Sequence, residues 1–328
     1  MSYNVRTKRN TTYWQLFFAV VLFFGCLYEI WATNLVIPDG QVWLDKVFIF
    51  LQDMPFVSKA ITSVFLLLNV VFLMLFLRHL SLIELRNYYP VLFYLLFVFI
   101  FPQTMNPWSM LVGFIIIVGV FPQLFNLDED SVHTKTFTYG LFCGILALTD
   151  FYFVFLLFFI YFICLFNRIY TFRSFILPIV GTSIAFIYLF SILYLTDNYD
   201  LMYCFINSVK EKSISFSFNE LIGGNSYSWF FILITGILSV ISFFRLLFKA
   251  STVVIHKRKK YYTLLFLTLS FAVLLFLFRS SMFLFTQVLL ILCTIIICMA
   301  MSHGKRIFFY KILFFLLLVL GFVFAFLY

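Results

Sequence analysis

The chain has 328 residues, of which 64% are hydrophobic and only 11% are charged, and its formal net charge is +9. Soluble domains carry about 25% charged residues, and a mean hydropathy of +1.10 leaves too little polar surface for a water-soluble fold. These values exclude a soluble enzyme and predict an all-α, polytopic integral membrane protein. Cytoplasmic loops explain the basic excess more economically than nucleic acid does, so no nucleic-acid partner is expected.

The N-terminal sequence MSYNVRTKRN precedes an apolar run of about 20 residues. A signal peptide has a shorter apolar core, followed by a cleavage site of small residues. No A-x-A-like site follows this run. We therefore expect an uncleaved first transmembrane helix.

A membrane-spanning helix needs about 20 mostly apolar residues. On this criterion we expect about eleven spans, which form a single transmembrane domain over residues 1–328. The expected spans lie at 13–33, 58–77, 88–102, 107–127, 136–149, 151–166, 174–195, 229–249, 261–278, 282–301 and 307–327.

Basic residues predict the orientation, because Lys and Arg collect in cytoplasmic loops. With a cytoplasmic N-terminus, seventeen of the 22 basic residues fall inside and the C-terminus lies outside. An error in the number of spans would invert every later loop, so the count and the orientation support each other. The five basic residues expected outside are Lys46, Lys59, Lys210, Lys212 and Arg279.

The first long outer segment, about 34–57, contains NLVIPDGQVWLDKVFIFLQDM. Its PDG is typical of a tight turn, since Pro presets φ and Gly accepts left-handed geometry. In the helix expected next, the polar residues Asp45, Lys46, Gln52 and Asp53 fall on one stripe. Such a helix is expected to lie in the membrane interface, with its apolar face toward lipid.

The second long outer segment, about 196–228, is polar, rich in Ser and Asn, and contains Gly-Gly. Loops of this length without structure of their own are uncommon and often functional. We expect this segment to contain a short helix around 199–210 and to cover a cavity or bind a partner.

The sequence lacks the familiar motifs of soluble enzymes. The sequence has no Walker motif, GxSxG, HExxH or dinucleotide fingerprint, and no Cys/His cluster predicts a metal site. All four His fall in expected inner loops. The residues left to carry chemistry are charged groups near the expected outer face.

Asp39 and Asp45 are the candidate catalytic residues. Facing a lipid-linked substrate at the interface, either one could act as a general base, or the pair could bind a divalent cation. In the structural alternative, Asp39 forms the turn and Asp45 belongs to the polar, solvent-facing side of the interfacial helix. Asp53 fits this solvation role, since it lies about 12 Å beyond Asp45 at 1.5 Å per residue.

Arg279, Asp150 and Glu29 are the candidates for substrate binding. Arg279 is the only Arg expected outside, and a guanidinium binds phosphate in bidentate fashion. Asp150 stands between two apolar segments, and an ionisable group at membrane depth is a functional candidate. Each has a structural alternative: a snorkelling Arg279, a helix-breaking Asp150, and a Glu29 solvated in the aromatic belt beside Trp31.

Two stretches carry a family resemblance. They are RNYYPVLFYLLFVFIFP at 86–102 and YGLFCGILALTDFYFVFLLFFIYFICLFNRIYTFRSFILPIVG at 139–181. Both resemble a family of uncharacterised polytopic inner-membrane proteins of Bacteroidota, over roughly residues 40–200. The resemblance implies a multi-pass protein of the bacterial inner membrane and no particular activity.

The overall layout, with GLFCGILALTD at 140–150, is also similar to the GT-C class of membrane glycosyltransferases. This resemblance implies a transferase that uses a polyprenyl-phosphate sugar at the outer face. Asp39 or Asp45 would match the acid of the first loop, and Arg279 the phosphate ligand. The chain departs from the class because the adjacent acidic pair after the first span is missing and no soluble outer domain is expected after the last.

Two other functions stay open at this point. One is a non-enzymatic membrane subunit of a cell-envelope secretion or translocation complex, which would contact its partners through Phe-rich helix faces and the 196–228 segment. The other is a transporter, although the Pro-containing spans show no matching halves of the kind that inverted repeats produce. In all three cases membrane lipids are expected to surround the chain.

Overall fold

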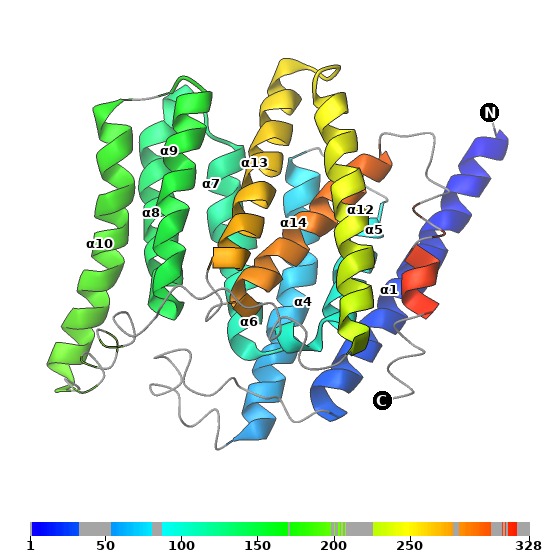
Figure 1. The fold of residues 1–328 in the computed structure, drawn as a ribbon, viewed down its shortest axis with the longest axis horizontal. Helices are drawn as coiled ribbons and strands as arrows, with labels where there is room; N and C mark the ends of the chain where they lie inside the picture. Colours follow the sequence, from blue (N-terminus) through cyan, green and yellow to red (C-terminus); the bar gives the residue numbers. More distant parts are fainter. Residues whose placement is uncertain are drawn as a thin grey trace.

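The structure is a computed structural model, and it confirms an all-α chain over the residues that it describes (Figure 1). The interfacial helix expected after the first span, and most of the second long outer segment, lie outside those residues. The described residues are 2–32, 54–80, 87–169, 171–197, 200, 203, 205, 207, 226–277, 282–302, 310, 312 and 314–319.

The described helices follow the apolar segments of the sequence. In chain order they are α1 (Ser2–Ala32), α4 (Pro55–His79), α5 (Tyr89–Ile100), α6 (Pro107–Ile115), α7 (Phe121–Phe125), α8 (Val132–Thr149), α9 (Leu156–Phe166), α10 (Phe172–Leu195), α12 (Ser226–Ala250), α13 (Ile255–Leu277) and α14 (Met282–Ser302). Four short elements lie between some of these helices: the 3-10 turns η1 (Pro102–Thr104), η3 (Glu129–Ser131) and η4 (Phe151–Phe155), and the π-helical turn η2 (Ile116–Val120).

Local sequence signals explain where several helices begin. α4, α5 and α6 each have Pro in the first two positions, where its missing N–H breaks no helical hydrogen bond. Asn106 caps α6, because its side-chain oxygen accepts the N–H of Ser109 at 2.7 Å. Thr171 and Ser174 form a reciprocal capping box at the start of α10.

Five stretches of described helix are long and apolar enough to cross a membrane, which indicates an integral membrane protein. The expectation of about eleven spans is not confirmed. The expected span 88–102 contains only α5, whose 12 residues extend about 18 Å, short of the roughly 30 Å hydrocarbon core. The expected span 151–166 starts as the 3-10 turn η4 before α9 begins. The five stretches are Tyr13–Ala32, Pro55–His79, Pro107–Phe125, Phe172–Leu195 and Leu284–Met301.

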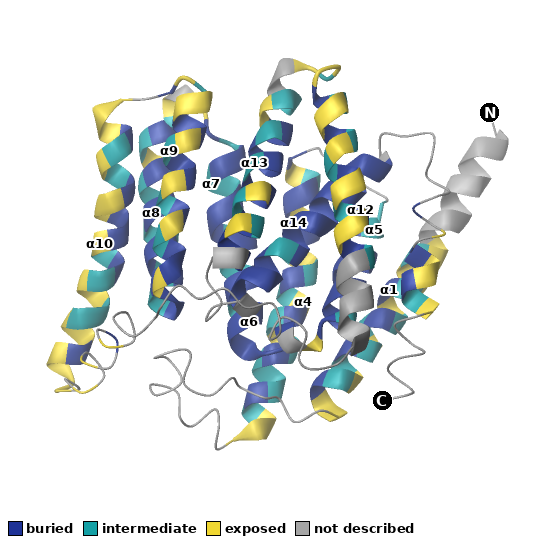
Figure 2. Ribbon diagram, viewed as in Figure 1, coloured by how far each residue is buried: buried dark blue, intermediate teal, exposed yellow. Residues whose placement is uncertain are grey.

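α14 forms the centre of the bundle, where it contacts α5, α6, α12 and α13 (Figure 1). In the most apolar window of each helix, 94% of the residues are buried for α14, against 22% for α1 and 28% for α10. Figure 2 shows the same contrast, with α14 largely dark blue and the outer faces of α1 and α10 marked by yellow. Apolar outer faces of this kind are suited to lipid rather than to water.

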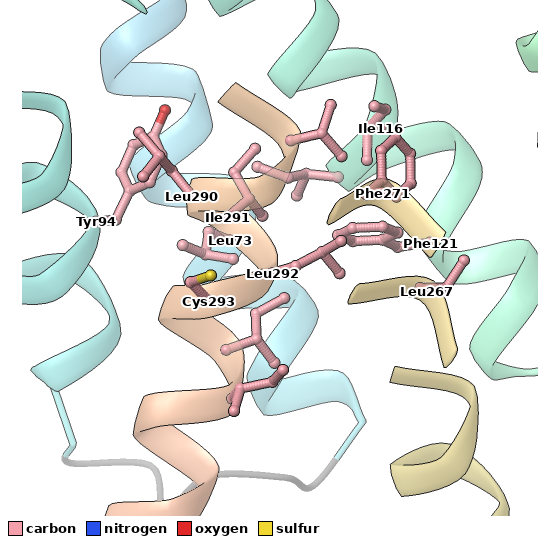
Figure 3. Close-up of a cluster of buried hydrophobic side chains, with 14 of the residues drawn as sticks. Leu73, Tyr94, Ile116, Phe121, Leu267, Phe271, Leu290, Ile291, Leu292 and Cys293 are labelled. Carbon is pink, nitrogen blue, oxygen red and sulfur yellow. The ribbon is translucent and has the colours of Figure 1, made fainter. Parts of the chain in front are cut away.

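Figure 3 shows the core around α14. Leu290 and Ile291 of α14 are fully or nearly fully buried, together with Leu73 of α4, Ile116 of η2 and Phe271 of α13. Because lipid tails are as apolar as these side chains, helix association in a membrane gains from close fit and polar contacts rather than from removing water. The fit of each helix on its neighbour therefore decides the arrangement.

α8 and α10 approach each other closely through small residues. Gly140 and Gly144 of α8 face Gly181 and its neighbours on α10, and a Cβ at Gly144 would stand 2.7 Å from the Cβ of Ala185. The Thr182 hydroxyl donates a 2.9 Å hydrogen bond to the Gly140 carbonyl oxygen. Small residues four positions apart commonly allow such backbone contact between membrane helices.

Gly140→Ala is expected to destabilise the protein, because the new Cβ would meet the Pro178 carbonyl oxygen. Overpacking of this kind typically costs about 1–3 kcal/mol. Gly236→Ala on α12 is the matched control, since nothing lies within 4 Å of a Cβ there and Ala favours a helix over Gly by about 1 kcal/mol. Thermal unfolding in detergent measures both variants. Equal melting temperatures for Gly140→Ala and the wild type would contradict the close approach.

Candidate functional site

Two of the five site residues nominated by the sequence, Glu29 and Asp150, fall in the described part of the chain. Asp39, Asp45 and Arg279 lie outside it, and so does the divalent-cation site expected at the first two. Within the described ranges, no group of three or more His, Cys, Asp or Glu side chains is placed to hold a metal ion.

Glu29 lies half-buried in the last turn of α1. At this corner of the bundle the Lys59 ammonium of α4 donates a 2.9 Å hydrogen bond to the Trp31 carbonyl oxygen. The Trp31 ring also lies 5.3 Å from the ring of Phe56. These contacts hold the end of α1 against the start of α4. The C-terminal end of α1 and the N-terminal end of α4 therefore lie at one corner.

Asp150 ends α8 and is only 2% exposed. Its carboxylate accepts the Tyr152 N–H at 3.1 Å and so caps the turn η4. Asp is among the residues most favoured for this position. We therefore interpret Asp150 as the polar break between two helices. Because α8 and α1 lie on opposite sides of the bundle (Figure 1), the structure does not bring Asp150 and Glu29 together.

The charge asymmetry of the sequence becomes an asymmetry between the two ends of the bundle. The C-terminal ends of α4, α9 and α12 and the N-terminal ends of α8, α10 and α13 share the upper end in Figure 1. Glu29 and Asp150 belong to helix ends on the opposite side. The described basic residues at or next to the shared ends are Arg78, Lys135, Arg168, Arg173, Arg245, Lys249, Lys257, Arg258, Lys259 and Lys260.

Asp128, just before the turn η3, contributes negative charge to this basic end. Its carboxylate lies 3.5 Å from the Lys135 ammonium. Lys260, at the start of α13, is buried. Burial lowers the pKa of Lys260, and the negative charge of Asp128 opposes that shift. Asp128 thus offsets part of the positive charge that surrounds it.

A buried polar cluster at the centre of the bundle was not singled out in the sequence. It consists of Asn69 of α4, Tyr94 of α5, Met110 of α6 and Gln287 of α14, all fully buried. The Gln287 amide donates to the Tyr94 hydroxyl oxygen at 2.8 Å, and the Asn69 amide donates to the Met110 carbonyl oxygen at 3.0 Å. We call these four residues the amide–tyrosine cluster.

The Met110 sulfur is the common neighbour in the amide–tyrosine cluster. It lies 3.6 Å from Asn69 Nδ2, 3.7 Å from Gln287 Nε2 and 3.8 Å from the Tyr94 hydroxyl oxygen. A thioether is polarisable but only a weak acceptor. The cluster is therefore held mainly by its amide and hydroxyl hydrogen bonds, with the sulfur filling the space between them.

Two acceptors of the cluster have spare capacity. Asn69 Oδ1 and Gln287 Oε1 are buried without a hydrogen-bond partner among the described residues. A buried group left unpaired costs about 1–3 kcal/mol. These two oxygens are therefore the unsatisfied acceptors of the cluster.

Gly113 allows both amides to approach α6. A Cβ at this position would stand 3.1 Å from Gln287 Nε2 and 3.2 Å from Asn69 Nδ2. The π-helical turn η2 begins just after, at Ile116, and turns of this type are frequent at functional sites. The cluster therefore lies close to an irregular turn of the described core.

The sequence did contain a signal for this cluster. Asn69 stands alone in LLLNVVFL, and Gln287 stands alone with Thr286 in LFTQVLLIL. Polar side chains inside membrane helices commonly form hydrogen bonds between helices. Both residues are uncharged, and their convergence depends on partners 41 and 193 positions away in the chain.

The described chemistry is thus of two kinds: neutral hydrogen-bonding groups inside the bundle, and charged groups separated to its two ends. Comparisons with protein-family models, with curated proteins and with solved structures find no match. Function therefore has to follow from the chain's own residues.

Asp150→Asn is expected to keep the wild-type melting temperature, whereas Asp150→Ala is expected to lose about 1 kcal/mol of stability. The reason is that Asn caps a helix about as well as Asp, and Ala does not cap. Thermal unfolding in detergent compares the three proteins. If Asp150→Asn were as unstable as Asp150→Ala, the charge rather than the cap would be holding this turn.

Tyr94→Phe is expected to destabilise the protein by about 1–2 kcal/mol, because the Gln287 amide loses its acceptor. Adding Gln287→Leu removes that stranded amide, so the double variant should recover part of the loss. Interhelical hydrogen bonds in a membrane protein average about 0.6 kcal/mol, with a maximum of about 1.7 kcal/mol. Unfolding of both single variants and the double variant yields the coupling, and strictly additive losses would contradict the bond.

Proposed function

We propose that this chain is a GT-C-like transferase that acts on a polyprenyl-phosphate sugar at the outer face of the bacterial inner membrane. The observation that carries the proposal is the corner between α1 and α4. There the half-buried Glu29 lies in the last turn of α1, and Lys59 of α4 donates a hydrogen bond to the Trp31 carbonyl oxygen. The segment 33–53 contains Asp39 and Asp45.

The chemistry assigns a role to each charged residue. Asp39 or Asp45 takes the proton of the acceptor hydroxyl, or the two carboxylates bind a divalent cation. The acceptor oxygen then bonds to the anomeric carbon, while the lipid phosphate leaves with the electron pair of the broken bond. Arg279 binds the phosphate, because a preorganised charge stabilises developing negative charge best in a low-dielectric site. Glu29 contributes a further carboxylate at this corner.

Charge supports the outer face as the location of this corner. The basic helix ends gather on one side of the bundle, and such ends face the cytoplasm under the positive-inside rule. The N-terminus is then cytoplasmic, the C-terminus lies outside, and the end of α1 reaches the outer face. A lipid-linked sugar would meet Glu29 and the segment 33–53 at the headgroup level.

A second function, a non-enzymatic subunit of an envelope secretion or translocation complex, is favoured by α10. This helix packs mainly on α8 and leaves Ile187, Tyr188 and Tyr194 exposed along its length. Tyrosine combines a large apolar ring with a polar group, which suits a protein interface as well as a membrane boundary. A partner helix could cover this face.

Asp39→Asn and Asp45→Asn test the transferase directly. Loss of a general base is expected to reduce product formation by about 10²- to 10⁴-fold, and Arg279→Ala and Glu29→Gln should also reduce it. The measurement is the cell-surface glycan profile, with protein level followed by immunoblotting. Asp197→Asn is the control, because this carboxylate follows α10 at a left-handed position, φ 54°, that Asn also tolerates.

An unchanged glycan profile in all four variants, at normal protein level, would end the transferase proposal. Purification in mild detergent then separates the two functions. Partner chains in stoichiometric amounts would support the subunit function, whereas a single chain with bound lipid would support the transferase.

A further inference from the structure

A groove of about 400 Å³ opens on the outside of the bundle between α9, α12 and α13. Most of its wall is aromatic or aliphatic, including Phe162 of α9, Phe243 of α12 and Phe266 and Leu269 of α13. The volume falls within the roughly 300–1,000 Å³ typical of small-molecule sites. The groove is thus large enough for a hydrocarbon chain.

Aromatic pairs between α9 and α13 form one wall of the groove. The ring centroids of Phe162 and Phe266 are 5.5 Å apart, and those of Phe166 and Tyr262 are 6.4 Å apart. Phe162 and Phe166 are nevertheless exposed on their outer sides. The pairs hold the two helices side by side while leaving apolar ring faces open to the surroundings.

The polar part of the lining lies at one end of the groove. Asn167 follows the last residue of α9, and Lys259 and Thr263 lie in the first turns of α13. These positions belong to the basic end of the bundle (Figure 1). Lys259 is exposed there, and Lys257 lies two residues before it in the same basic run.

The apolar part has the length of one membrane leaflet. Leu269 lies ten residues after Lys259 on α13, which corresponds to about 15 Å along a helix. The hydrocarbon core of a bilayer is roughly 30 Å thick, so one leaflet contributes about half of that. A charged mouth and an apolar trough of this length match a phosphate and its attached acyl chain.

We propose that this groove binds an anionic phospholipid of the surrounding leaflet. The phosphate lies at Lys259 and Asn167, and one acyl chain runs along Phe162 and Phe266 to Leu269. Charge complementarity favours this occupant, because basic pockets between membrane helices bind anionic headgroups. An apolar partner helix would leave the Lys259 ammonium without an anion. The site is independent of the proposed transferase, since it lies at the opposite end of the bundle.

Native mass spectrometry of the full-length protein in detergent tests the proposal. The probes are dioleoyl phosphatidylglycerol and dioleoyl phosphatidylcholine, which differ in headgroup charge but share acyl chains. Wild type is expected to retain more phosphatidylglycerol. Lys259→Gln should weaken its binding about fivefold, the equivalent of the about 1 kcal/mol that one lysine contributes near anionic lipid.

Two further variants distinguish lipid binding in the groove from nonspecific electrostatic attraction of anionic lipid. Lys257→Gln removes the same charge from the same run, but Lys257 does not line the groove, so this variant should weaken binding less than Lys259→Gln does. Leu269→Trp fills the apolar end without touching the charge and should also reduce binding. Equal losses in Lys257→Gln and Lys259→Gln, equal retention of the two lipids, or unchanged binding in Leu269→Trp would each overturn the proposal.

Discussion

The 2.8 Å hydrogen bond from the Gln287 amide to the Tyr94 hydroxyl joins α14 to α5 at the centre of the bundle. The Asn69 amide makes the matching connection between α4 and α6 through the Met110 carbonyl oxygen. In a chain this apolar, hydrophobic contact alone does not distinguish one helix face from another. Directional bonds between buried amides and a phenol do distinguish them, so the register of four helices depends on this cluster.

The packing of the other helices depends on small residues that allow close contact. Gly113 brings α6 against both amides, and a Cβ there would crowd them. On one side, the glycines of α8 and α10 make a second close contact, which attaches the edge helix α10 with little burial of its own. The described structure is therefore a dense centre with edge helices attached to it. The outer faces of those edge helices are left for lipid or for a partner.

Charged side chains distinguish the two ends of the bundle from each other. Lys259 lines the groove at the basic end. The half-buried Glu29 lies at the opposite end, in the last turn of α1. The two proposed sites therefore have different chemistry. The proposed lipid groove combines a cation with an apolar trough, whereas the proposed transferase site depends on carboxylates. Neither uses the central cluster, whose groups are neutral and enclosed.

Hydropathy along the chain predicted the positions of several helices closely. The expected segment 174–195 became α10 (Phe172–Leu195), and 282–301 became α14 (Met282–Ser302), each within two residues. Charge along the chain also predicted which helix ends share a side, because a span reverses the direction of the backbone. Hydropathy and charge are properties of each segment by itself, so they do not depend on how the segments pack. The α5 segment shows the limit, since an apolar run between two prolines is equally compatible with a short helix.

The candidate sites were less accessible to such reasoning. Sequence patterns nominated carboxylates by their position next to spans, and Asp150 turned out to cap a turn on the far side of the bundle from Glu29. The amide–tyrosine cluster and the groove at Lys259 each combine side chains from three or four helices. Hydropathy determines that a helix enters the membrane, but the rotation and neighbours of that helix depend on packing and hydrogen bonds between distant residues. Those contacts exist only in the folded bundle.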